Sequence, residues 1–263
     1  MMAIVGSEFE KMIWVDSDAF LLQNATNLIK QTKTGTLFWH DIWGVDQKNP
    51  IWTILNIEKP VVGFSQESGV VYIDKTKNWL PLYIAAYMNQ HQRLFYSLLW
   101  GDKDTFFISF EALKMPYTFV PYAPQLIGKM GNEMVGDVLQ TKKNKNKFYG
   151  YSFVQVDTNG RPAYVHFVSG KDLVLSYLNK NKTLFTMIRT WDPNGAHVDY
   201  NGIDPTKKSV DIEIDSGDFY GPLLDANDAL GPFVTRLRES YEKAQQIIKT
   251  TSSQCIFGFV PCN

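Results

Sequence analysis

Short hydrophobic runs separated by polar segments mark the first half of the chain and predict a series of strands. Met12–Val15 is an unbroken apolar run, as expected of a buried strand. Gly35–Trp39 predicts a second strand. Gly69–Asp74, which is rich in β-branched residues and follows the polar segment Ser65–Ser68, predicts a third.

Helical spacing of apolar residues predicts the segments that connect and cover these strands. Gln23–Thr32 and Ile51–Leu55 each fit a short helix. Trp79–Leu94 carries apolar residues near helical spacing and should pack on the sheet. Asp102 is a typical N-cap residue, so a further helix is expected over Lys103–Leu113.

The second half of the chain contains a clear hairpin pattern. Phe148–Val156 and Pro162–Val168 flank the turn Asp157–Gly160, whose Asn-Gly pair tolerates positive φ. The other expected elements are a strand at Tyr117–Pro121, a solvated loop at Thr141–Lys147, a helix at Lys171–Leu178, a strand at Leu184–Arg189 and an amphipathic closing helix marked by Phe233, Leu237, Tyr241, Ala244 and Ile248.

Composition restricts the classes of protein to which the chain can belong. Its 263 residues are 44% hydrophobic and 20% charged, which fits one large α/β domain or a domain with an extension. A formal charge of −1 argues against nucleic-acid binding. No apolar run reaches the about 18 residues of a membrane span, and no signal peptide precedes the first strand. Cys255 and Cys262 could form a small disulfide loop or remain two thiols.

Two carboxylates follow the first predicted strand at once, in the Asp-x-Asp pattern of Asp16 and Asp18. Like charges this close raise each other's pKa unless a cation lies between them. Oxygen ligands favour a hard divalent ion such as Mg²⁺ or Mn²⁺. The alternative is a solvated turn in which one aspartate caps the following segment.

An Asp-x-Asp metal site supports two reaction classes. Haloacid-dehalogenase-type phosphohydrolases need Thr or Val where this chain has Phe20, although the segment Gly101–Asp104 imitates their later acidic motif. Glycosyl transfer from a nucleotide sugar instead uses a metal on the diphosphate, together with a carboxylate near the anomeric carbon. Glycosyl transfer is the leading interpretation, and the phosphohydrolase is the alternative.

Four ordered motifs resemble the fungal Golgi α-mannosyltransferase family, whose α-1,2- and α-1,3-mannosyltransferases extend mannan and N-glycan outer chains. The motifs are Trp14–Asp18, Gly35–Asp41, Gln66–Lys75 and Gly101–Phe106. The resemblance is dense from Ala3 to Gly128, and after Gly150 it depends mainly on His166.

The resemblance implies an α/β fold of the GT-A type, with a mixed sheet flanked by helices. Residues 1–263 would form one glycosyltransferase domain, with the motifs in 1–130 and the hairpin and closing helix in 131–263. It also implies retaining transfer from GDP-mannose with Mn²⁺ to a mannose-containing glycan, in the Golgi lumen behind one membrane anchor. Other glycosyltransferases would be possible complex partners.

Roles follow from the matching positions. Asp16, Asp18 and His166 would bind the metal. Asp104 would be the carboxylate beside the sugar, with Glu67 as a second catalytic group. The residues expected to contact donor or acceptor are Ser68, Gly69, Asp102 and Lys103. Imidazole also fits Mn²⁺ better than Mg²⁺.

Alternatives to these roles remain open on the sequence. His166 could be a core histidine, Asp104 a helix-start carboxylate favoured by the helix dipole, and Glu67 a surface residue at a strand edge. Only fifteen residues precede Asp16, so the resemblance predicts an N-terminally truncated chain that lacks the anchor and part of the nucleotide-binding half. Such a chain could also be a non-catalytic relative that binds a glycan or a partner enzyme, with an unpaired strand edge at Met12–Val15.

Overall fold

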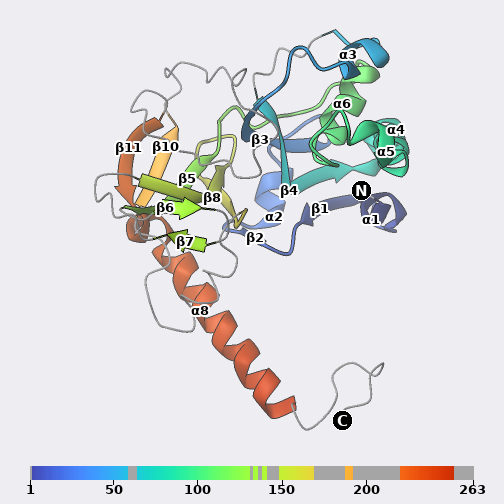
Figure 1. The fold of residues 1–263 in the computed structure, drawn as a ribbon. Coiled ribbons are helices and arrows are strands. Elements are labelled where there is room, and N and C mark those ends of the chain that lie inside the picture. Colours follow the sequence, from blue (N-terminus) through green and yellow to red (C-terminus); the bar gives the residue numbers. More distant parts are fainter. Residues whose placement is uncertain are drawn as a thin grey trace, which may run out of the picture.

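The computed structural model describes residues 2–58, 64–130, 133–135, 138–140, 148–168, 187–191 and 220–251 (Figure 1). The elements of the first half are α1 (Met2–Gly6), β1 (Lys11–Val15), β2 (Ala19–Leu21), α2 (Ala25–Ile29), β3 (Thr36–Gly44), α3 (Ile51–Ile54), β4 (Phe64–Asp74), α4 (Lys75–Gln90), α5 (Gln92–Phe95) and α6 (Thr105–Ala112). The elements of the second half are β5 (Gln125–Met130), β6 (Glu133–Val135), β7 (Val138–Gln140), β8 (Phe148–Val156), β9 (Pro162–His166), β10 (Met187–Trp191), β11 (Tyr220–Asp225) and α8 (Ala226–Thr251).

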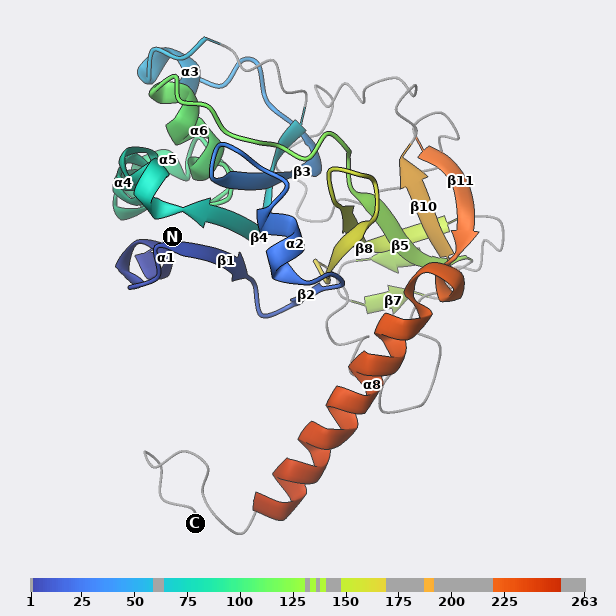
Figure 2. The same cartoon turned by 180° about the vertical axis from the view of Figure 1, so that it is seen from behind.

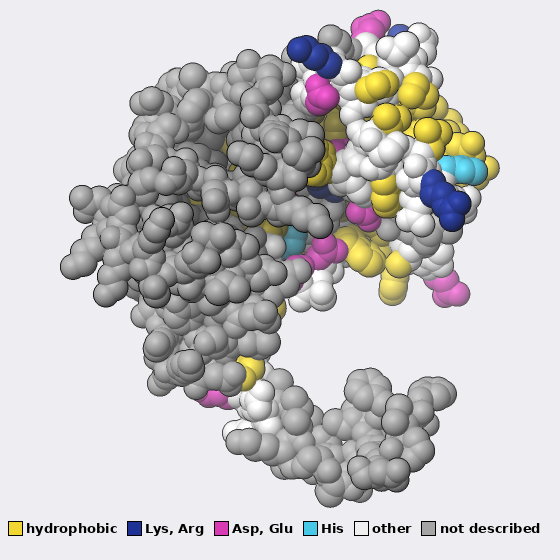
Figure 3. Space-filling model, in the orientation of Figure 1, with side chains coloured by type: hydrophobic (Ala, Val, Ile, Leu, Met, Phe, Trp, Pro, Cys, Tyr) yellow, Lys and Arg dark blue, Asp and Glu magenta, His cyan; other side chains and the backbone are white. Residues whose placement is uncertain are grey.

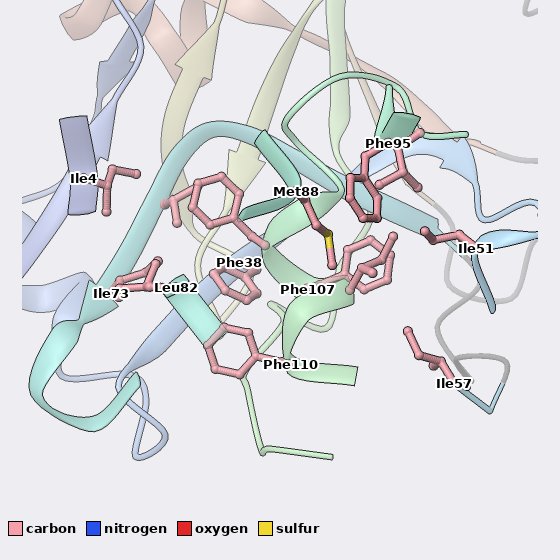
Figure 4. Packing of buried hydrophobic residues seen from close by; sticks show 14 of the residues in the cluster. Ile4, Phe38, Ile51, Ile57, Ile73, Leu82, Met88, Phe95, Phe107 and Phe110 are labelled. Atoms are coloured by element: carbon pink, nitrogen blue, oxygen red, sulfur yellow. The ribbon is translucent and has the colours of Figure 1, made fainter. Parts of the chain in front are cut away.

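A three-stranded sheet in the order β1-β4-β3 forms one part of the described fold. Both of its pairings are antiparallel, with Trp14 opposite Val71 and Trp39 opposite Glu67. β1 is one of the two edge strands of this sheet, which agrees with the edge expected at Met12–Val15. Helices α4 and α6 pack together against this sheet, and their apolar residues meet those of β3 and β4 in a core that includes Phe38 and Phe107 (Figure 4).

The junction of β4 and α4 shows why the sheet and its covering helix are joined without a loop. Asp74 ends β4 and caps α4, because its side chain accepts hydrogen bonds from the backbone N–H and the hydroxyl of Thr76. The amide of Asn78, one turn later, donates to the carbonyls of Thr34 and Gly35 before β3. The helix is therefore held to two strands at its first turn.

A six-stranded antiparallel sheet, in the order β11-β10-β5-β8-β9-β2, forms the second part. The hairpin of β8 and β9 turns at Asp157–Gly160, where Gly160 has φ +77 and Asp157 exchanges backbone hydrogen bonds with Arg161 and Gly160. The short strand β2 begins only three residues after β1 ends (Figure 2). It pairs with β9. The chain thus passes from one sheet to the other within the Asp-x-Asp segment.

A shared apolar core joins the two sheets. The indole N–H of Trp39 on β3 donates to the carbonyl of Val156 on β8 over 2.7 Å. The Trp39 ring meets the edge of Tyr164 from β9 at a centroid distance of 5.1 Å, and both side chains are fully buried. This contact packs β3 against the hairpin of β8 and β9, which carries His166.

Several expectations from sequence are confirmed, with corrected boundaries. The strands expected at Met12–Val15, Gly35–Trp39 and Gly69–Asp74 are present, and so are the hairpin, the short helices and the closing helix. Ser65–Ser68 is part of β4, because these polar residues pair with β3. Lys171–Leu178, the loop Thr141–Lys147 and both cysteines lie outside the described residues, and so does the start of the strand expected at Leu184–Arg189.

Three expectations are wrong. The helix expected from Lys103 begins at Thr105 and has Asp104, not Asp102, at its N-cap position, because residues 101–104 form a turn. Tyr117–Pro121 is not a strand and makes only an isolated parallel bridge between Phe119 and Phe38. Among the described residues that bridge is the one parallel pairing, and both larger sheets are antiparallel where a mixed sheet was expected.

The content of helices and strands agrees with the predicted α/β class, and the GT-A arrangement stays a prediction. α8 extends away from the sheets in both ribbon views (Figures 1 and 2). Among the described residues, none of the helices has the length and apolar character needed to cross a bilayer.

Candidate functional site

Asp16, Asp18 and His166 form a compact group, which we call the strand-end cluster. Each offers one ligand atom, and these atoms all lie within 4.8 Å of one another. The Nε2 atom of His166 lies 3.3 Å from Oδ1 of Asp18. Both aspartates are half-buried, and His166 is 8% exposed. The three predicted metal ligands are therefore brought together, at a place that solvent can still reach.

Backbone pairing on both sides fixes the Asp-x-Asp segment. The N–H of Asp16 donates to the carbonyl of Gly69 over 2.8 Å, which continues the pairing of β1 with β4. The carbonyl of Asp18 accepts from the N–H of Phe167 over 2.9 Å, and Ala19 lies opposite His166 in the pairing of β2 with β9. The crossing from one sheet to the other is what places His166 beside the two aspartates.

Glu67 holds the imidazole of His166 from behind. Its Oε1 atom lies 2.7 Å from Nδ1 of His166 and 2.8 Å from the backbone nitrogen of Gly69. Its Oε2 atom accepts from the hydroxyl of Tyr164, a fully buried residue. A carboxylate on one ring nitrogen orients the imidazole and directs the other nitrogen outward, as in many metal-binding histidines.

Gly69 leaves the space that the imidazole occupies. A Cβ atom at this position would lie 2.4 Å from Nδ1 and 2.8 Å from Cε1 of His166. No real Cβ atom comes so close, so any other residue would displace the ring. Gly69 thus contributes through its carbonyl, its N–H and its missing side chain.

The charges of the cluster are unbalanced. Burial raises the pKa of Asp16, whereas the 2.6 Å hydrogen bond from the indole of Trp14 and the charge of His166 lower it. The charges of Asp18 and Glu67 raise it further, and the net pKa is raised. Burial lowers the pKa of His166, but the hydrogen bond and charge of Glu67, followed by the charges of Asp18 and Asp16, outweigh it and leave the pKa raised. The site attracts positive charge.

Lys103, Asp41 and Asp104 form a second group, which we call the lysine cluster. The Nζ atom of Lys103 lies 3.0 Å from Oδ2 of Asp41 and 3.6 Å from Oδ1 of Asp104. It also donates to the hydroxyl of Ser65 and to the carbonyl of Gln66, at 3.0 and 3.3 Å. One cation therefore joins β3, β4 and the turn before α6.

Both carboxylates of the lysine cluster are buried. Burial raises the pKa of Asp41 and of Asp104, and the charge of Lys103 opposes the increase in each. Burial lowers the pKa of Lys103, yet the charges of Asp41 and then Asp104 outweigh it, so its pKa is raised and it stays protonated. The Oδ2 atom of Asp104 accepts from the N–H of Trp100 at 3.4 Å.

The two clusters adjoin one another through β4. Gln66, whose carbonyl accepts from Lys103, is followed directly by Glu67. The negative charge of Glu67 is also one of the causes that raise the pKa of Asp41. The ionisable side chains of both clusters thus influence one another across the end of a single sheet.

The remaining predicted residues lie at the margin. Ser68 is half-buried on β4, between Glu67 and Gly69. Asp102 has an exposed side chain, and its carbonyl accepts from the N–H and hydroxyl of Thr105. Both positions leave a polar side chain open to a ligand.

Sequence reasoning assigned no role to Asp41, Tyr164 or Trp14. Asp41 had a signal, because a carboxylate at the end of an apolar strand is expensive to bury without a partner. Tyr164 and Trp14 looked like ordinary core residues, and only the folded chain shows their hydroxyl and indole N–H bonded to carboxylates.

A comparison with protein families gives one match. Residues 51–157 match the family described as "Mannosyltransferase putative". The matched segment contains β4, the turn with Lys103 and Asp104, and the first strand of the hairpin, but not Asp16, Asp18 or His166. No curated protein matches the chain. The family match supports a mannosyltransferase relationship, and with it glycosyl transfer from a sugar donor to a glycan acceptor in general.

Proposed function

We propose that the chain is a metal-dependent, retaining α-mannosyltransferase that uses GDP-mannose and Mn²⁺ to extend a mannan or N-glycan acceptor in the Golgi lumen. The convergence of Asp16, Asp18 and His166 carries this proposal. The family match supports the transfer of mannose, and the metal, the donor and the acceptor are our proposal.

The donor set of the strand-end cluster fits a divalent cation. If Nδ1 of His166 donates its proton to Glu67, the lone pair of Nε2 faces a carboxylate oxygen of Asp18 3.3 Å away. Two acceptors at this distance need a proton or a metal ion between them. Two carboxylates and an imidazole suit Mn²⁺, which when bound would stabilise the negative charge of a diphosphate leaving group.

The chain's own residues would then divide the work. Asp16 and Asp18 hold the cation at the end of β1, and Glu67 keeps His166 oriented toward it. Glu67 is 4% exposed and both its oxygens are engaged, so support of His166 is the role that its contacts favour over contact with the sugar.

Asp104 and Lys103 belong to the sugar side of the proposed site. Asp104, which is 5% exposed, is the carboxylate that we propose to act beside the sugar. Lys103 holds it in place, and Ser68 and Asp102 are the open polar groups for donor or acceptor hydroxyls.

The test is transfer of mannose from GDP-mannose to an α-mannoside acceptor by the purified chain. We expect activity with Mn²⁺, its loss in excess chelator, and its loss in Asp16→Asn, Asp18→Asn and His166→Gln. Glu8→Gln, at an exposed position away from the clusters, is the control. Transfer that persists in chelator would contradict the metal role, and hydrolysis of a generic phosphate ester would favour the phosphohydrolase instead.

A non-catalytic glycan-binding protein is the second candidate, and the deep burial of Asp104 and Glu67 favours it. Calorimetry separates the two. GDP binding that requires Mn²⁺ supports the enzyme, whereas binding of mannosides alone, unaffected by Asp16→Asn, supports the second candidate.

A further inference from the structure

A row of aromatic side chains lies exposed on α4. Trp79, Tyr83 and Tyr87 are spaced four residues apart, which puts them one above another on a helix, and they are 53, 58 and 49% exposed. Leu80 lies beside them and is 52% exposed. We call these four residues the aromatic row.

The opposite face of α4 already serves the core. Leu82, Ala85 and Met88 are buried against the sheet and α6. α4 is therefore apolar on both faces, a pattern that normally belongs to a helix covered on both sides. Large exposed apolar patches on soluble proteins mark interaction sites.

The apolar surface continues onto α5. The ring of His91 lies 4.3 Å from that of Tyr87, between centroids, and Leu94 is 53% exposed. Tyr87, His91 and Leu94 line a shallow pocket of about 320 Å³ with Arg93. Figure 3 shows hydrophobic side chains gathered over the region where Figure 1 labels α4 and α5, bordering on cyan and dark-blue side chains.

The segment that carries this surface has charges of one sign, and the carboxylates of Glu10 and Asp102 lie at its borders, beside Lys75 and Tyr96. From Lys75 to Gly101 the sequence contains no Asp and no Glu, although the whole chain has 27 acidic and 26 basic residues. The exposed cations Lys77 and Arg93 lie at either end of the aromatic row. Glu8 and Glu10 limit the basic surface near Lys75, whose N–H donates to the carbonyl of Glu10.

We propose that the aromatic row docks on an anionic phospholipid surface. Trp and Tyr favour the boundary between headgroups and acyl chains, where Leu80 and Leu94 would also lie. Lys77 and Arg93 would meet the phosphates of the headgroups. The charge complementarity, with no carboxylate in the whole segment, selects an anionic partner.

A glycan is the competing occupant, because aromatic rings also serve as platforms for sugars. Recognition of a sugar needs hydrogen-bonding groups around the rings. The exposed side chains between Trp79 and Tyr87 are only Leu80 and Tyr83, and the amide and imidazole groups of Gln90, His91 and Gln92 lie beyond one end of the aromatic row. The rings themselves therefore have few such groups around them. The observations therefore favour lipid.

Vesicle flotation tests the proposal and requires neither metal nor donor, so its outcome is separate from that of the proposed function. We expect the chain to float with phosphatidylcholine vesicles that contain phosphatidylserine, and more weakly with phosphatidylcholine alone. The triple variant Trp79→Ser, Tyr83→Ser, Tyr87→Ser should bind these vesicles at least about tenfold more weakly. Lys77→Gln with Arg93→Gln should lose about tenfold on anionic vesicles only.

Phe9→Ser is the matched control. Phe9 is an aromatic residue 72% exposed but flanked by Glu8 and Glu10, which an anionic surface repels, so its loss should leave flotation unchanged. Equal melting temperatures would show that all variants fold. Absence of flotation, or flotation unaffected by the triple variant, overturns the proposal. The proposal is also overturned if the aromatic row binds oligomannosides, or if sedimentation shows that it joins two copies of the chain in a dimer.

Discussion

The strand-end cluster and the lysine cluster lie next to each other, and they differ in what balances their negative charge. Asp41 and Asp104 are buried, and Lys103 lies between them. Asp16 and Asp18 are half-buried, and the imidazole of His166 beside Asp18 contacts Glu67 through its other ring nitrogen. The lysine cluster contains its own cation, whereas the strand-end cluster would take its cation from solution under the proposed function.

Removal of Lys103 should have the largest effect on stability. Lys103→Met leaves two buried carboxylates without a cation, and loss of one partner from a buried ion pair costs about 3–5 kcal/mol. Urea unfolding at neutral pH measures this loss. A cost below about 1 kcal/mol would mean that the cluster is not held by charge.

The loss in Lys103→Met should also depend on pH. Burial raises the pKa of Asp41 and Asp104 in the folded chain. A carboxyl whose folded pKa is higher than its unfolded pKa is stabilised by acid, and that stability is lost as the pH rises through the folded pKa. The variant should therefore recover part of its stability as the pH falls toward the ordinary range of aspartate.

Substitutions in the strand-end cluster should act on metal binding and not on folding. Asp16→Asn or Asp18→Asn should weaken Mn²⁺ binding by more than the about 10–100-fold that loss of a supporting residue costs. Because burial raises the pKa of Asp16, its charged form opposes folding, and Asp16→Asn should unfold no more easily than the parent chain in chelator. Calorimetry with Mn²⁺ and urea unfolding check the two halves of this prediction.

Gly69→Ala should show whether Mn²⁺ binding depends on the position of the His166 ring, because it leaves the residue itself unchanged. The new Cβ displaces the ring but leaves every ligand in the sequence, so Mn²⁺ affinity should fall about 10–100-fold. Gly6→Ala is the control, since no atom lies within 4 Å of a Cβ at that position. Unchanged affinity in Gly69→Ala would show that His166 does not bind the ion.

Asp157, in the hairpin turn, offers the smallest test of how neighbouring groups balance the charge of a buried carboxylate. Burial raises its pKa, but backbone hydrogen bonds from Arg161 and Asn159, with side-chain bonds from Gln23 and Arg161, outweigh it and lower the pKa to about 2. Its contribution is present above the ordinary pKa of aspartate and lost as the pH falls through about 2. Asp157→Asn should cost about 1–2 kcal/mol at neutral pH, and progressively less as the pH falls toward 2, by urea unfolding.

Local pattern was enough to predict the elements that depend on neighbours in sequence. The apolar run at Met12–Val15 and the Asn-Gly turn at Asp157–Gly160 each form the expected strand and hairpin. The pattern failed where a distant partner decides. Ser65–Ser68 is polar, yet pairing with β3 makes it strand, and Asp102 has the chemistry of an N-cap but stands two residues too early.

The candidate site was predictable in its residues but not in its contacts. The Asp-x-Asp pattern and the family resemblance led to Asp16, Asp18 and His166, which the fold brings together. Glu67 was expected at the sugar, and its bonds to Tyr164 and His166 span 97 and 99 residues of sequence. No local signal encodes a contact over that distance, because it depends on how two sheets pack.

The transition of the chain between sheets at Asp16–Ala19 has a consequence for how the protein is made. The two aspartates emerge from the ribosome before the imidazole, which follows only with the end of β9. A nascent chain that stops short of His166 holds two carboxylates and cannot complete the proposed ligand set. Affinity for a divalent ion would then indicate that β9 has paired with β2. An ion bound at that stage would oppose the reopening of the long loop between Asp18 and His166.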